Sequence, residues 1–241
     1  MSESKKDISR VEGVFPTHNK LVGELTEFYF GPEKQQSPWL RFCDRAYRDM
    51  NRTLRGLDVR EMKTLRTYGN TLICDAIDDL AQRCREKRCD EASFDRWHRK
   101  LCHKLVTLYY DRMAIGQAQK WVNMALKYCA IWLSLTSPRD PLLCAWPYMH
   151  LPIDQRILRY LRNKDQAVLS ENIYPGKAWS AIEDYKEYLR VQKNIRKAVR
   201  AEKGANRNTD YIAGMTSALD VDFIGWSRTK NEKRSKKRSG N

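Results

Sequence analysis

The chain has 241 residues, 45 Lys and Arg against 30 Asp and Glu, and a hydrophobic content of 41%. It is long enough to bury a core, which excludes a small disulfide-stapled peptide. The longest nearly apolar stretch, 128–135, is too short to span a bilayer, and the first residues lack the apolar region of a signal peptide. We therefore expect an intracellular protein, cytoplasmic in a prokaryote or nuclear in a eukaryote, with no membrane contact, no disulfide and seven reduced cysteines.

The net charge of +15 is concentrated in two stretches, 190–207 and 228–241. Each carries seven Lys or Arg and one Glu, whereas the rest of the chain is nearly balanced. A surplus of this size attracts polyanions, and neutralisation of phosphates by Lys and Arg supplies most sequence-independent affinity for nucleic acid. The sequence therefore predicts DNA as the partner; the alternative is a solubilising tail and a solvated helix face.

Helical periodicity dominates the chain, and no segment alternates like a β-strand. We predict an all-α, multi-helix domain over 13–227, as one body or as two helical subdomains with a cleft, between a disordered N-terminus (1–12) and a disordered basic tail (228–241). Local signals mark four helix starts: Ser37 before Pro38, and the capping residues Asp58, Asp90 and Asp154. The predicted helices span 38 to near 56, 58–80 with Gly69 as a weak point or break, 91–108, 116–135, 154–161 and 179–202, with a loop over 137–152 and a last short element at 219–226.

Lys120 is unusual for its position, because the same helix face continues through Met124, Tyr128 and Ile131. It is predicted to lie in the first turn of its helix. Partial burial and the positive end of the helix dipole both lower the pKa of a lysine, and a neutral amine is a nucleophile that forms Schiff bases. The alternative is a snorkelling lysine whose stem covers apolar surface.

Asp154 follows a stiff apolar entry, Leu151-Pro152-Ile153, and is a natural helix N-cap. The pattern Gly116-x-Ala118-x-Lys120 at one helix start, followed by 151–154 at another, resembles the signature of the helix-hairpin-helix DNA glycosylase superfamily, over about 113–161. The 34 positions from Lys120 to Asp154 are most similar to the spacing in archaeal-type 8-oxoguanine DNA glycosylases. In this chain Ala118 replaces the second hairpin glycine.

This resemblance implies a DNA glycosylase that flips and excises a damaged or modified base, with Lys120 as nucleophile and Asp154 as its acidic partner, with or without AP-lyase activity. The amides of Gly116, Gln117, Ala118 and Gln119 would bind a phosphate at the helix N-terminus. Further backbone contacts are expected from Arg196, Lys197 and Arg200. The aromatic candidates for a base pocket, some of which we expect to belong to the core alone, are Trp121, Trp132, Trp146, Tyr148 and Trp179.

Other chemistries fit the sequence less well. Cys84, Cys89, His98, Cys102 and His103 lack the paired spacing of a zinc site, so we expect no metal and no cofactor. The acids Asp75, Asp78 and Asp79 have no second motif that would complete a nuclease. The alternative to a glycosylase is a non-enzymatic helical nucleic-acid-binding protein, in which Lys120 only snorkels and Asp154 only caps.

Overall fold

The computed structural model describes residues 18–31, 37–162, 178–204 and 217–223. Within these ranges the chain is all-α and has no strand, as predicted. The elements in chain order are α1 (His18–Phe30), α2 (Pro38–Met50), η2 (Asn51–Thr53), α3 (Val59–Arg85), α4 (Glu91–Leu108), α5 (Ile115–Thr136), η3 (Pro141–Tyr148), α6 (Gln155–Arg162), η6 (Trp179–Ala181) and α7 (Tyr185–Gly204), where η denotes a 3-10 helix. The predicted disordered segments 1–12 and 228–241 lie outside the described residues.

The helix starts follow the local signals in the sequence. Pro38 is at the start of α2, and Asp58 and Asp90 cap α3 and α4, each with its side chain accepting from the amide three residues on. The prediction was wrong at three places. Residues 141–148 form η3 instead of a loop, α7 begins at Tyr185 instead of Trp179, and α1 was not predicted.

Gly69 does not break α3, a helix of 27 residues that continues through this position. A Cβ at this position would lie 2.2 Å from Cη2 of Trp121. The glycine therefore provides space for the fully buried indole of Trp121, whose Nε1 donates to the Cys43 carbonyl at 2.9 Å. This close approach brings α3 and α5 together.

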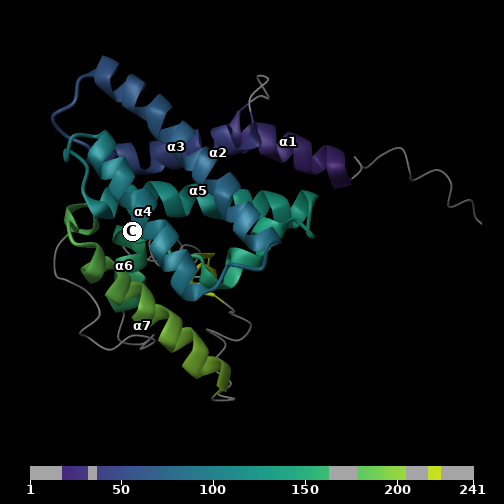
Figure 1. Ribbon diagram of the computed structural model, residues 1–241. Coiled ribbons are helices and arrows are strands. Elements are labelled where there is room, and N and C mark those ends of the chain that lie inside the picture. Colours follow the sequence, from purple (N-terminus) through teal and green to yellow (C-terminus); the bar gives the residue numbers. More distant parts are fainter. Residues whose placement is uncertain (1–17, 32–36, 163–177, 205–216, 224–241) are drawn as a thin grey trace, which may run out of the picture.

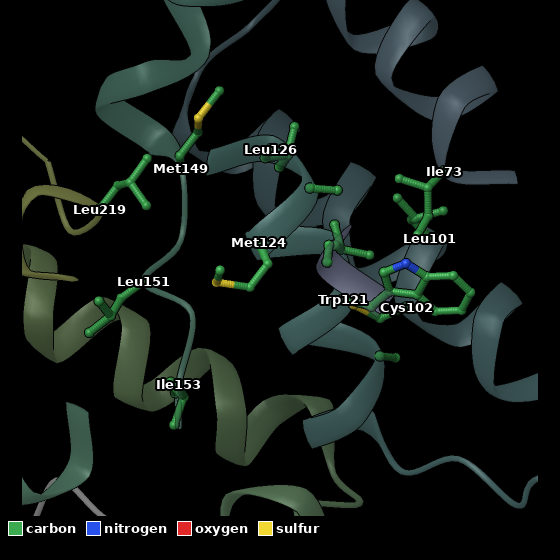
Figure 2. Packing of buried hydrophobic residues seen from close by; sticks show 14 of the residues in the cluster. Ile73, Leu101, Cys102, Trp121, Met124, Leu126, Met149, Leu151, Ile153 and Leu219 are labelled. Carbon is green, nitrogen blue, oxygen red and sulfur yellow. The ribbon is translucent and has the colours of Figure 1, made fainter. Parts of the chain in front are cut away.

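Helix α5 is the centre of the molecule. It crosses the middle of the structure, with α1 to α3 on one side and α6 and α7 on the other (Figure 1). Nearly every residue from Ile115 to Leu126 is buried. An extended segment leads from η3 to α6, and Figure 2 shows Met149, Leu151 and Ile153 along it, all buried. This segment carries the chain to Asp154. No helix of the described part is both long enough and apolar enough to cross a membrane.

Candidate active site

Lys120 lies in the second turn of α5, because the helix begins at Ile115, one residue earlier than predicted. Its side chain is only 4% exposed, and Nζ lies 2.7 Å from Oδ2 of Asp154. A charged lysine is rarely buried to this extent unless it is paired. The structure thus brings together the two residues that the sequence analysis singled out, from elements 34 residues apart.

The two carboxylate oxygens of Asp154 have different partners. Oδ1 accepts from the amides of Arg156 and Ile157 at 2.9 and 3.0 Å, which caps α6, while Oδ2 pairs with Lys120. Burial raises the pKa of Asp154, but the charge and hydrogen bond of Lys120 and the two amides outweigh it, so the pKa lies below its usual value. Asp154 is therefore a carboxylate at neutral pH, with negative charge beside the amine.

A second buried ion pair, which the sequence analysis missed, lies on the same helix. Lys127 of α5 pairs with Oδ2 of Asp222, and the Phe223 ring covers the ammonium with its centroid 4.9 Å from Nζ. Asp222 is fully buried, and its Oδ1 has no hydrogen-bond partner among the described residues. Burial raises the pKa of Asp222 despite the positive charges of Lys127 and Lys120, and the charge of Asp154 raises it further. The two pairs therefore interact electrostatically.

Gln119 fixes the geometry of the first pair. Its side-chain amide donates to the carbonyls of Gly116 and Ile153 at 2.8 and 3.1 Å. Its oxygen accepts from the Ile153 amide at 3.3 Å and from Asn123 at 2.9 Å. Both backbone groups of Ile153 are thus held by the residue next to Lys120. Gln119 and Ile153, the neighbours of Lys120 and Asp154 in the sequence, are therefore hydrogen-bonded to each other.

A buried polar network extends from Gln119 and Asn123 into the core. Asn123 contacts His98 at 2.9 Å and the Tyr188 hydroxyl at 2.9 Å, and that hydroxyl also contacts His150 at 2.8 Å. His150 in turn contacts Asp95 at 2.8 Å. Burial lowers the pKa of His98 and lowers that of His150 to about 4. Both imidazoles are therefore neutral at pH 7, and their ring nitrogens serve as hydrogen-bonding partners in the core.

At the N-terminus of α5, the amides that were predicted to bind a phosphate are covered by the fold. Gly116, Gln117, Ala118 and Gln119 are all buried, and the Gly116 amide donates to the Ile182 carbonyl at 2.8 Å. A Cβ on Gly116 would lie 1.8 Å from the Trp179 carbonyl oxygen. The glycine is thus required for the close approach of η6, which covers the helix end. This segment supports Lys120 from within the fold and presents no free amide surface to DNA.

The basic residues predicted on α7 divide into buried and exposed. Arg196 is 3% exposed in the structure and is bound by Asp95 through two hydrogen bonds of 2.9 and 3.2 Å, so its assignment to DNA was wrong. Arg200 pairs with Glu91 at the surface. Lys197 is exposed. A buried guanidinium already bound to a carboxylate cannot also reach a phosphate.

The five aromatic candidates do not share one pocket. Trp121 belongs to the core, and Trp132 packs edge-on against Trp39 at a centroid distance of 5.7 Å, so neither is free to stack a base. Trp179 covers the start of α5, and Tyr148 is half-buried. Trp146 lies parallel to Phe223 and donates to Asp220 at 3.0 Å, next to the Lys127–Asp222 pair. Trp146 thus contacts Phe223, the residue whose ring covers the ammonium of Lys127.

The described residues hold no group of three His, Cys, Asp or Glu side chains with the geometry of a metal site. His98 and Cys102, two of the residues weighed for zinc, contact each other in the buried network. Comparisons of the chain with protein-family models, with curated proteins and with solved structures gave no match. Function is therefore inferred from the residues of the site.

Proposed function

We propose that the protein is a DNA glycosylase with AP-lyase activity, in which Lys120 is the nucleophile and Asp154 its acidic partner. The observation that carries this proposal is the 2.7 Å contact between Lys120 Nζ and Asp154 Oδ2, in a site where both side chains are at least 86% buried. A lysine amine can form a Schiff base, and a carboxylate beside it can stabilise positive charge on the sugar.

The chemistry assigns a separate task to each group. The ammonium of Lys120 gives up one proton, its lone pair bonds to C1′ of the sugar, and the C1′–N bond breaks as the base leaves with a proton. Positive charge that develops on the sugar is stabilised by the carboxylate of Asp154, which its low pKa keeps ionised. A proton then moves from the Lys120 nitrogen to O4′ as the C1′–O4′ bond breaks, which leaves a protonated imine between Lys120 and C1′. Water takes a proton from C2′, the C3′–O bond breaks, and the 3′-phosphate leaves.

The burial of Lys120 sets a condition on this activity. With 4% of its side chain exposed, Nζ reaches a sugar carbon only after a local opening of the structure. The same burial favours the second candidate function, a non-enzymatic nucleic-acid-binding protein in which the Lys120–Asp154 pair only joins α5 to α6. The two functions differ in whether Nζ ever meets a substrate.

Borohydride trapping on DNA that contains an abasic site tests the proposal, because a Schiff-base lysine reacts with the exposed aldehyde whichever base is removed. The Lys120→Gln variant is compared with Lys127→Gln, a matched control that removes a buried, paired lysine two turns along the same helix. Both are made in a chain without residues 228–241, whose lysines would trap aldehydes unspecifically. Circular dichroism confirms that each variant is folded.

We expect a crosslink that disappears in Lys120→Gln and persists in Lys127→Gln. A crosslink that survives in Lys120→Gln, or none in the parent chain, would reject the nucleophile and leave the binding protein. Asp154→Asn keeps an oxygen that accepts from the two α6 amides, so it should fold and yet lose activity.

A further inference from the structure

The outer face of α4 is rich in basic residues. Residues three and four positions apart lie on one side of a helix, and the exposed residues of α4 include Arg96, Arg99, Lys100, His103 and Lys104. The opposite side of α4 is buried in the core. The two acidic residues of this helix, Glu91 and Asp95, are both bound by arginines of α7. Their negative charge is therefore used within the fold and does not offset the outer face.

A groove of about 420 Å³ runs between this face and α3. Arg96, Lys100 and Lys104 line the α4 wall, whereas the α3 wall carries Arg83 together with Asp75 and Asp79. Arg83 already pairs with Asp79 at 2.8 Å. Among the described residues, no carboxylate lies within salt-bridge distance of the three cations on α4. The groove lining therefore has four cations and two carboxylates, a net charge of +2, and its concave shape concentrates that field.

Helix α7 extends the basic surface on the other side of α4. The Tyr185 hydroxyl contacts His98 at 2.8 Å, and Arg200 reaches Glu91, so the two helices run antiparallel. Figure 1 shows them as neighbours. The exposed residues of α7 add Lys186, Arg190, Lys193 and Lys197. Exposed cations are therefore present on both α4 and α7.

We propose that the α3–α4 groove and the outer face of α4 bind the phosphate backbone of DNA. Arg96, Lys100 and Lys104 follow one another at four-residue intervals along about 12 Å of helix, and a DNA strand presents a phosphate about every 3.4 Å along its axis. A linear row of cations matches a linear polyanion better than a compact anion. The site is independent of Lys120 and remains in place whether or not the protein excises bases.

The test is the salt dependence of binding to a short DNA duplex, measured by fluorescence anisotropy with the full-length chain. The groove variant is Arg96→Ala, Lys100→Ala and Lys104→Ala together. The matched control is Arg48→Ala, Arg52→Ala and Lys63→Ala, three exposed cations on α2, η2 and α3. Both variants lose the same charge, and all six side chains are exposed, so both should fold.

We expect the slope of log K against log salt to become shallower by about 3 in the groove variant, because each lost phosphate contact removes about one unit. Affinity should fall at least about tenfold between the parent and the groove variant near physiological salt. The control should retain the parent slope. Equal slopes in the two variants, or no measurable binding by the parent, would overturn the proposal. Borohydride trapping is scored separately, so a failed glycosylase does not affect this result.

Discussion

The Lys120–Asp154 pair gives the sharpest energetic prediction. Lys120→Met keeps most of the side-chain volume but leaves the Asp154 carboxylate, 14% exposed, with only the two α6 amides. Removing one partner of a buried pair costs about 3 kcal/mol. Asp154→Asn retains the helix cap and removes the charge, so we expect a loss of about 2 kcal/mol. The double variant contains neither charge.

The coupling between the two changes follows from the distance and the burial. At 2.7 Å, with an effective dielectric constant of about 20, the attraction is about 6 kcal/mol. Desolvation of both groups offsets much of it. Contacting residues show couplings of about 0.5 to 3 kcal/mol, and we expect about 2 kcal/mol for this pair.

Urea denaturation of the parent, the two single variants and the double variant measures this coupling. The control cycle uses Arg83 and Asp79, which lie at a similar 2.8 Å but are 39% and 51% exposed. Exposed pairs contribute little, so the control coupling should stay below about 0.5 kcal/mol. An equally small coupling for Lys120 and Asp154 would show that the two side chains do not form a buried ion pair in solution, and it would contradict the proposed site.

Three further predictions concern the surroundings of the site. Gly69→Ala places a methyl group against Trp121 and should cost about 2 kcal/mol in urea denaturation, because overpacking exceeds the gain in helix propensity; a stabilised variant would contradict it. Gly116→Ala forces the Trp179 carbonyl away, so hydrogen exchange of the η6 segment should quicken while that of α3 stays constant. His150, whose pKa of about 4 lies below the unfolded value, binds its proton more readily in the unfolded chain. His150 alone should therefore lower stability by about 2 kcal/mol from pH 7 to pH 5. His98, whose pKa is also lowered by burial, adds a loss of the same sign, so His150→Gln should remove only the His150 part of the pH dependence.

The sequence predicted the features that depend on neighbouring residues. Asp58 and Asp90 cap helices through amides only three residues away, so the local sequence was enough to locate the starts of α3 and α4. Residues 141–148 were predicted as part of a loop because the turn residues 137–141 come at its start, but η3 begins at Pro141 and also contains Pro147. Helix α7 begins at Tyr185, after the extended backbone at Ile182. Asp184 marks that boundary, because its carboxylate accepts from the Lys186 amide at 2.8 Å, a capping signal that the sequence analysis missed.

Within the site, the same distinction separates success from failure. Lys120 was recognisable because apolar residues share its helix face, and Asp154 because it stands before a helix start. Arg196 resembled its exposed neighbours in composition, but its partner Asp95 lies 101 residues away. Asp222 likewise depends on Lys127, 95 residues distant. Long-range partners decide whether a charge is buried, and a single sequence does not record them.

The burial of the α5 N-terminus changes how the hairpin-like motif has to be understood in this chain. Gly116 allows η6 to approach, and Gln119 holds the backbone of Ile153 beside Asp154, so the motif residues position the amine and the carboxylate. Because their amides are used within the fold, the proposed DNA contacts are assigned to other groups. Arg96, Lys100 and Lys104, which have no salt bridge to any residue that the structure describes, are exposed and follow one another along the outer face of α4. Positioning and DNA binding are thus assigned to different helices, and the two sets of variants separate them.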